Sequence, residues 1–265
     1  MKRWRHCALW IALSALAGCA PKLARPPEGT TGDRMARYRA SVSERQARAV
    51  SMSAALSMWV ERSGDRMPGT QAELRLAAPD RMRLRLFAAF GTALDVGLRG
   101  DSLRAYVPSW KRSLRLDAAS ESLGIDAPAD RMVRAFSATW QPPEEAWNRA
   151  AWSESLLRVT WKEDDDSLRV AIGADGLPSW AEVVMGEGTV LRVRYRGWDH
   201  GSGGAWPSHV ELVDNTHDVR VTCRATQIRF ASRPDEERLA VRWPPGTTPV
   251  TLAELRAALG RLGFL

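Results

Sequence analysis

Three histidines near position 200 are the residues best suited by type to metal or acid–base chemistry. His200, His209 and His217 all lie between Asp199 and Asp218. Their spacing matches neither HxH nor HExxH, and no paired cysteines accompany them, so the pattern of a zinc site is absent. A glycine-rich sequence follows His200, which is typical of a loop between strands. We therefore expect no metal site, no cofactor and no catalytic residue here.

The acidic run from Glu163 to Asp166 could supply oxygen ligands to calcium. It lacks the ligand spacing of known calcium loops, and a solvated hairpin turn explains it more simply. The sequence also contains no GxSxG elbow, no P-loop and no dinucleotide-binding fingerprint. We expect the protein not to be an enzyme.

Cys19 is the residue whose surroundings are most specific. Lys2, Arg3 and Arg5 precede an apolar run that ends in Leu-Ala-Gly-Cys at positions 16–19. The run is shorter than the roughly 18 residues needed to cross a bilayer as a helix, so it has the form of a signal peptide ending in a lipobox. We expect residues 1–18 to be removed and Cys19 to become the first residue.

This N-terminus resembles that of bacterial lipoproteins. The resemblance implies a diacylglycerol thioether on Cys19 and a further acyl chain, such as palmitate, on its amino group. Two or more chains anchor a protein stably to a membrane. Residue 20 is Ala and not the Asp that retains enterobacterial lipoproteins in the inner membrane. The expected location is therefore the cell envelope, lipid-anchored to the outer membrane on its periplasmic face.

Removal of the signal peptide lowers the charge and leaves one cysteine unmodified. The whole chain has 38 basic and 31 acidic residues, and three basic residues leave with positions 1–18, so 35 − 31 gives +4. Cys7 leaves as well, and lipidation uses Cys19, so Cys223 has no partner for an internal disulfide. The fold must be stabilised by a hydrophobic core.

Alternation with a period of two dominates the chain after a proline-bearing tether at 19–32. Arg and apolar residues alternate over 81–86 and 191–196, which is typical of antiparallel strands with one apolar face. We expect further strands near 50–61, 70–77, 94–99, 102–108, 112–117, 155–161, 167–173, 179–185, 207–213 and 219–230. Helices are expected from Asp33, as an N-cap, to about 49, within an insertion at 120–151, and from a Thr251–Glu254 capping box to about 261.

These elements predict a mainly β domain with some helix over residues 33–265. Its architecture would be an incomplete antiparallel barrel, or strongly curved sheet, covered by a helical lid from the insertion and preceded by the N-terminal helix. The many Arg residues alternate along strands and do not cluster with aromatics. We interpret them as solvated sheet faces and expect no nucleic-acid partner.

The segment from Met82 to Pro108 resembles the LolB-like outer-membrane lipoproteins and their LolA relatives. In both, a strand ends in a short apolar tip before Gly and returns as two further strands. The segments at 175–195, 207–212 and 230–246 follow the same family order. The resemblance implies an apolar cavity for the acyl chains of lipoproteins. It also implies that Phe90, next to Gly91, contacts the membrane, although the family has Leu there and Pro where this chain has Ala89.

The predicted function is a non-enzymatic, lipid-anchored carrier or receptor that binds acyl chains of lipoproteins or lipids and aids their transfer to the outer membrane. A periplasmic carrier protein is a further candidate partner. The alternative is a structural or sensory envelope lipoprotein of the same fold, such as a stress regulator or assembly scaffold, that acts through its surface. The predicted ligand-binding residues are those of the apolar sheet face and the lid: Leu84, Leu86, Leu94, Val96, Leu98, Leu168, Val170, Ile172, Leu191, Val193, Tyr195, Phe136 and Trp140.

Overall fold

A computed structural model describes residues 30–117, 129–185, 188, 190–200, 204–216 and 218–261. The predicted signal peptide, Cys19 and most of the tether lie outside the described residues, as does His217. Within them the protein is mainly β, and its strands form one curved sheet that does not close.

The strands lie in the order β15-β7-β6-β5-β4-β3-β1-β14-β13-β12-β11-β10-β9-β8, with β2 paired to β1. All neighbours are antiparallel except β15, which runs parallel to β7. The strands in chain order are β1 Met52–Arg62, β2 Asp65–Arg66, β3 Thr70–Ala77, β4 Arg81–Ala88, β5 Gly91–Arg99, β6 Ser102–Val107, β7 Arg112–Leu116, β8 Ala151–Ser153, β9 Leu156–Glu163, β10 Asp166–Ile172, β11 Pro178–Val184, β12 Val190–Asp199, β13 Trp206–Asp214, β14 Val219–Phe230 and β15 Thr248–Pro249.

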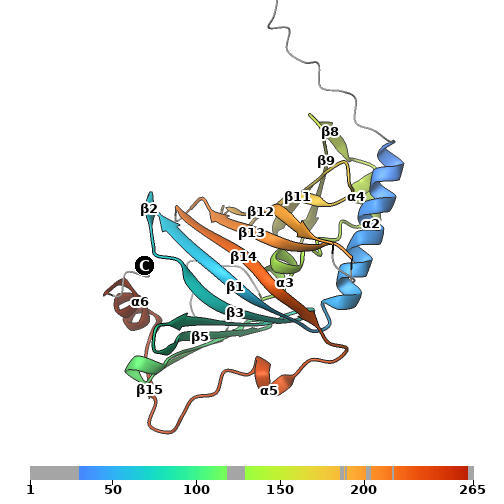
Figure 1. The fold of residues 1–265 in the computed structure, drawn as a ribbon. Coiled ribbons are helices and arrows are strands. Elements are labelled where there is room, and N and C mark those ends of the chain that lie inside the picture. The colour runs from blue at the N-terminus through green and yellow to red at the C-terminus, as the bar shows by residue number, and fades with distance from the viewer. Residues whose placement is uncertain are drawn as a thin grey trace, which may run out of the picture.

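The helices that the structure describes are α2 Thr31–Arg48, the 3-10 turn η1 Pro108–Trp110, α3 Ala129–Ser137, α4 Glu144–Trp147, α5 Glu236–Leu239 and α6 Leu252–Arg261. Helix α3 lies inside the curve of the sheet, α2 and α6 lie at opposite ends of it, and α5 lies on its outer side (Figure 1). None of the helices in the described part of the chain combines the length and hydropathy needed to cross a bilayer. All twelve long strands expected from alternation are present; the short β2, β8 and β15 were not expected.

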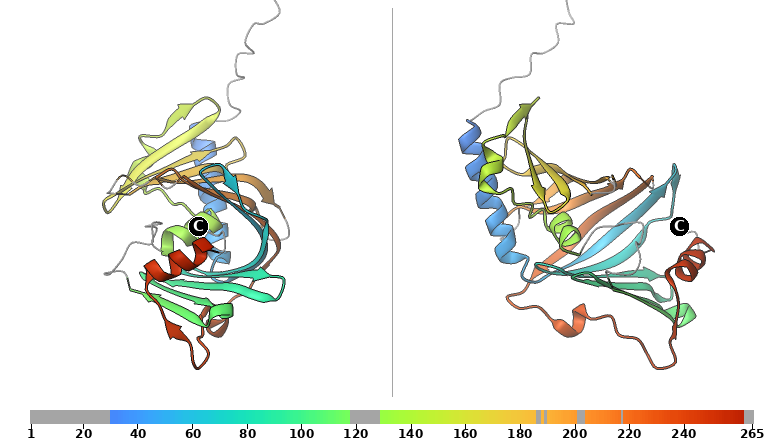
Figure 2. Two further views of the ribbon diagram at one scale, coloured as in Figure 1. Left: turned by 90° about the vertical axis from the view of Figure 1, so that its left-hand side faces the viewer. Right: turned by 180° about the vertical axis from the view of Figure 1, so that it is seen from behind.

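The alternation predicted from sequence gives the sheet one continuous apolar face. Apolar residues face one another across neighbouring strands. Examples are the pairs Leu98–Leu103, Leu74–Leu84 and, in the other part of the sheet, Val159–Val170. Because the sheet curves, this face is concave, and α3 lies inside the curve (Figure 2, left). Strands with alternating patterns can bury one face only if something covers it, and the two halves of this sheet are covered differently.

Helix α2 begins three residues earlier than expected. The N-cap is Thr30, and Asp33 is the third helical residue that completes a capping box with it, so the assignment of Asp33 as N-cap was wrong. The helix packs against the β10–β11 turn, where Gly176 leaves room for Arg37: a Cβ on Gly176 would lie 2.6 Å from Cβ of Arg37. The close approach explains why this turn carries glycine at a φ of +78°.

The C-terminal segment takes a path that was not anticipated. After β14 the chain crosses the convex side of the sheet through α5, adds β15 to the free edge of β7, and places α6 at the far end of the concave side (Figures 1 and 2). We call residues 231–250 the strap. It covers the edge that β7 would otherwise expose.

Candidate functional site

Eight of the predicted ligand-binding residues lie in a filled core. These residues, which we call the filled half, are at most 6 % exposed and belong to β10, β12 and the lid: Leu168, Val170, Ile172, Leu191, Val193, Tyr195, Phe136 and Trp140. All belong to one cluster that also contains Tyr38 and Val42 of α2. The sequence placed them correctly on the apolar face, but here that face is covered by side chains of the protein itself.

A buried polar network fixes the lid over the filled half. The Tyr38 hydroxyl donates to the carbonyl oxygen of Trp140 at 2.5 Å, and the Trp140 indole N–H donates to the Tyr195 hydroxyl at 2.7 Å. The Tyr195 hydroxyl in turn donates to the carbonyl oxygen of Ala135 at 2.9 Å. Burial raises the pKa of both tyrosines far above the ordinary value, so both stay neutral and serve as hydrogen-bond groups. A satisfied network of this kind makes the lid rigid.

An ion-pair cluster holds α3 to the β9–β10 turn. Both guanidinium nitrogens Nη1 and Nη2 of Arg134 donate to the Glu163 carboxylate at 2.9 Å. Arg131, only 4 % exposed, pairs with Glu163 at 2.9 Å and with Asp166 at 3.4 Å. The interpretation of this acidic run as a solvated turn was therefore wrong for Glu163 and Asp166, which anchor the lid. Burial opposes ionisation of Glu163, but hydrogen bonds and charge from Arg134 and Arg131 hold its pKa below the ordinary value.

The other five predicted ligand-binding residues form a half-buried apolar surface on β4 and β5. We call this set, all on the concave face, the open strip: Leu84, Leu86, Leu94, Val96 and Leu98. Leu84 and Leu86 pack against the cluster that contains α3, whereas Leu94 and Val96 pack against a second, smaller cluster that contains α6. The strip is thus bounded by helices on both sides and retains exposed apolar surface between them.

A pocket of about 510 Å³ lies where the end of α2, the β3–β4 turn and the lid meet. Its lining combines polar side chains, among them Gln46, Gln141 and Glu163, with apolar ones such as Val133 and Trp161. Sequence reasoning missed this pocket because its residues come from five separate segments.

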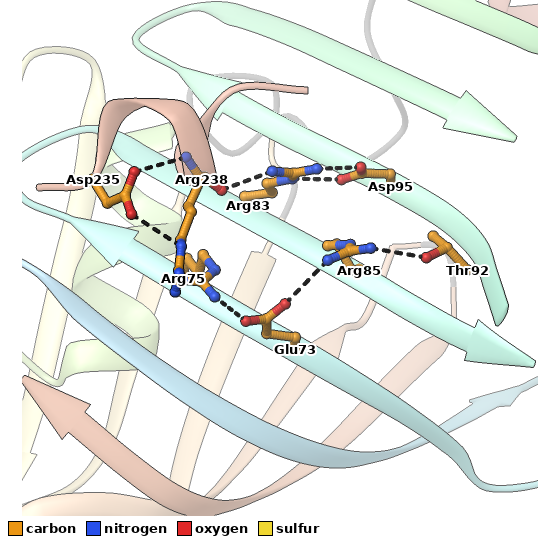
Figure 3. A network of polar contacts seen from close by, with 8 residues as sticks. All are labelled: Glu73, Arg75, Arg83, Arg85, Thr92, Asp95, Asp235 and Arg238. Atoms are coloured by element: carbon orange, nitrogen blue, oxygen red, sulfur yellow. Dashed lines mark hydrogen bonds and ion pairs between the residues drawn. The ribbon is translucent and has the colours of Figure 1, made fainter. Parts of the chain in front are cut away.

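Many Arg residues of the convex face are solvent-exposed, as expected, and in addition pair with carboxylates that are buried beneath them. Arg83 binds Asp95 through Nε and Nη2 at 2.8 and 2.6 Å, and Asp95 is only 6 % exposed. Figure 3 shows this pair beside a chain from Arg75 through Glu73 to Arg85. A similar arrangement occurs on the other half, where the buried carboxylates Glu182 and Glu211 each accept from flanking Arg residues. Charges buried in this way must be paired.

Phe90 lies at the tip of the β4–β5 turn and is fully exposed, with a relative accessibility of 104 %. The next residue, Gly91, has a φ of +119°, which a residue with a side chain adopts only at a cost. Phe87, at the base of the same turn, lies under the Arg85 guanidinium at 5.5 Å. An exposed phenyl ring on a tight turn is a candidate contact for an apolar partner or a membrane.

The residues that could do chemistry elsewhere do not assemble into a site. His200 is exposed, and the residues described here contain no group of three or more His, Cys, Asp or Glu side chains that could hold a metal. Burial raises the pKa of the Cys223 thiol to about 12, and the side chain is 2 % exposed. A thiol in such surroundings is unreactive.

The open, strongly curved antiparallel sheet with α3 inside it defines the LolA/LolB-like fold, as the resemblance predicted. No protein-family model and no curated protein sequence matches the chain. Among solved structures, a LolA superfamily protein from Nitrosomonas europaea has a TM-score of 0.52 at 12 % identity, over 80 % of this chain and 98 % of that one.

Two further solved structures agree with this fold. A putative outer membrane lipoprotein-sorting protein domain from Vibrio parahaemolyticus has a TM-score of 0.50 at 11 % identity, over 79 % of this chain and 97 % of that one. A DUF1329 family protein from Desulfovibrio piger has a TM-score of 0.51 at 10 % identity, over 82 % and 98 %. Identities this low establish the shared fold, and the function must be argued from the site.

Proposed function

We propose that the protein is a non-enzymatic carrier or receptor of the cell envelope that binds an acyl chain of a lipoprotein or lipid on the open strip. The observation that carries the proposal is the half-buried apolar surface of Leu84, Leu86, Leu94 and Val96 on the concave face, in a fold shared with a lipoprotein-sorting domain. The filled half supplies a rigid frame, and the open strip supplies the binding surface.

The physical basis of binding is burial of methylene groups. Each methylene that leaves water for an apolar surface gains about 0.8 kcal/mol, so a long acyl chain binds without any specific polar contact. Because no directional contact needs to be broken, such a ligand can also be released to another protein or to a membrane. Binding by apolar burial together with easy release suits transfer better than permanent storage.

Binding of a fluorescent acyl probe tests the proposal. The soluble chain from Ala20 onward, which contains every residue that the structure describes, should bind the probe with saturation. Leu86→Glu, on the open strip, should weaken binding about tenfold or more, which corresponds to ~1.4 kcal/mol. Phe87→Glu is the matched control, because Phe87 is the next residue of β4, is also half-buried, and points to the convex face.

Circular dichroism must show that both variants are folded. Equal weakening by Leu86→Glu and Phe87→Glu, in folded proteins, would contradict binding on the concave face. Absence of any probe binding by the unchanged chain would contradict the carrier function itself. It would favour a scaffold or sensory lipoprotein that acts through its surface, a function compatible with the packed core of the filled half.

Lipid anchoring through Cys19 is part of the same proposal. Thioether formation requires the thiol, so Cys19→Ser should leave an unprocessed or soluble protein that incorporates no labelled fatty acid. Cell fractionation checks this expectation. A membrane-bound protein of mature size in the Cys19→Ser variant would show that the anchor lies elsewhere.

Phe90 extends the proposal to the membrane surface. A fully exposed phenyl ring beside an acyl-binding strip is suited to enter the headgroup region when the protein delivers its cargo. The outer membrane is the proposed target, with the periplasmic side as the working location. A periplasmic carrier protein remains the proposed source of cargo.

A further inference from the structure

We propose that α6 is a displaceable stopper: it covers one end of the open strip in the unloaded protein and leaves it when an acyl chain binds. This inference rests on the proposed function, because it concerns how access to the same strip is regulated.

Helix α6 covers apolar surface that an acyl chain on the strip would need. Leu252 and Leu255 are 6 % and 7 % exposed and pack in one cluster with Leu103, Ala105, Val107 and Leu114 of β6 and β7. Leu94, Val96 and Leu98 of the open strip pack against that same cluster. The core of this cluster is entirely apolar. An acyl chain and the leucines of α6 therefore compete for one kind of surface at one place.

The strap that leads to α6 is fixed to the sheet as far as Val250. On the convex side Arg83 donates to the carbonyl oxygen of Arg238 at 2.8 Å. Val241 is buried against Gly97, which has no side chain to exclude it. A Cβ added to Gly97 would lie 2.8 Å from Cγ2 of Val241. At the sheet edge the backbone N–H of Val250 donates to the carbonyl oxygen of Ser113 at 2.8 Å.

Beyond Val250 the attachment changes in kind. Thr251 and Glu254 form a capping box with each other at the start of α6. Hydrogen bonds from Thr251 lower the pKa of the Glu254 carboxylate, and the charge of Arg112 in β7 also acts on it and helps to lower that pKa. Leu252 and Leu255 are the side chains of α6 that the structure shows buried. A groove of about 690 Å³, lined by Trp110, Arg112, Thr248, Pro249, Val250, Glu254, Leu255 and Ala257, lies along the helix. A helix whose described contacts with the sheet are made mainly by two leucines, and which is flanked by a groove, can open locally while the strap and sheet remain intact.

The position of α6 matches the end of the molecule where cargo would arrive. Trp110 of η1 packs against the cluster that contains α6, and η1 contacts β5, the strand that begins directly after Phe90. Figure 2 shows α6 at the end of the concave side away from α2. The stopper and the exposed phenyl ring therefore lie at the same end of the strip, so that membrane contact and access to the strip are close together.

Weakened docking of α6 should increase the affinity of the strip for a fluorescent fatty-acid probe. When the competent state is a minor fraction, the apparent dissociation constant falls as that fraction rises. We expect Leu252→Ala with Leu255→Ala, in the chain from Ala20 onward, to bind the probe about tenfold more tightly. Ala253→Ser, an exposed position of the same helix, is the control and should leave affinity unchanged.

Hydrogen exchange on the unchanged chain gives a second measurement that needs no variant. A saturating probe should speed exchange of the amides of residues 252–261 and leave those of β10 and β12 unchanged. Slower exchange in α6 would overturn the proposal, because it would make α6 a wall of the site. The proposal also fails if the unchanged chain binds the probe and the double variant binds no more tightly. If no form of the chain binds, the proposed function fails and this inference falls with it.

Discussion

The two halves of the concave face have the same alternating sequence pattern but differ in how deeply their apolar side chains are buried. Leu168 and Val170 of β10 alternate with polar residues just as Leu84 and Leu86 of β4 do. The β10 residues are fully buried, whereas the β4 residues are half-buried. The difference lies in the cover. The filled half lies beneath α2, α3 and a locked polar network, whereas the open strip is covered at its margins by the helices that the structure describes.

This difference assigns separate tasks to the two halves. A face that is closed by hydrogen-bonded groups gives stability and a fixed shape, and a face with residual exposed apolar surface can bind. The concave side is therefore part core and part candidate site. Substitutions on either half of the sheet should therefore differ in their effect on stability and on binding.

A charge in the filled half should destabilise the fold strongly, and the same charge on the open strip should do so much less. Val170→Asp places a carboxylate at a fully buried position with no partner, and should cost about 4 kcal/mol or more. Leu86→Asp leaves the new carboxylate partly solvated and should cost no more than about 2 kcal/mol. Thermal and urea unfolding of both variants would measure this. Equal losses would mean that the open strip is core as well.

The stability of the sheet at the open strip should depend on Arg83, which lies on the convex face behind it. Arg83→Ala leaves Asp95 buried without its bidentate partner and also frees the strap at Arg238, so a loss of about 2–4 kcal/mol is expected. Arg99→Ala, exposed on the neighbouring strand, is the control and should change stability by less than about 0.5 kcal/mol. Urea unfolding measures the loss of stability in both variants. A similarly small loss in both would mean that the Arg83–Asp95 pair contributes no more than a surface ion pair.

The ion-pair cluster under the lid should make the filled half sensitive to acid. The folded pKa of Glu163 lies below its ordinary value of about 4.3, so the stabilisation it gives is present above that pH and is lost as the pH falls through the folded pKa. Glu163→Gln should therefore lower stability at pH 7 and flatten its decline in acid. Asp165→Asn, exposed in the same turn, should do neither. Parallel acid curves for Glu163→Gln and the unchanged chain would exclude this role.

The smallest effect on stability is expected at Phe90. Because its side chain is fully exposed, Phe90→Glu should change the free energy of unfolding by less than about 0.5 kcal/mol. It should nevertheless reduce association of the unlipidated chain with liposomes, which flotation measures. A large drop in the thermal midpoint with unchanged flotation would place the ring in the core and remove its proposed membrane contact.

Much of the fold could be predicted because strand periodicity is local. A residue of β4 or β12 has its face set by its immediate neighbours, so alternation placed the eleven predicted binding residues of the strands on the concave face. Near-helical spacing placed the other two, Phe136 and Trp140, in the lid. The strap could not be predicted in this way. Residues 231–250 are held by contacts such as Val241 with Gly97, which are distant in the sequence and leave no periodic pattern.

The sequence by itself determined the long strands, the Thr251–Glu254 capping box and the motif around Cys19, because each depends on residues within a few positions of one another. Only the tertiary structure decided which part of the apolar face is filled. Alternation reports that a side chain points to the concave side, but burial depends on what lies above it. Over Leu168 lies a lid locked by Tyr38, Trp140 and Tyr195, which come from positions far apart in the chain. Over the open strip, the part of the chain that the structure describes forms no comparable hydrogen-bonded lock.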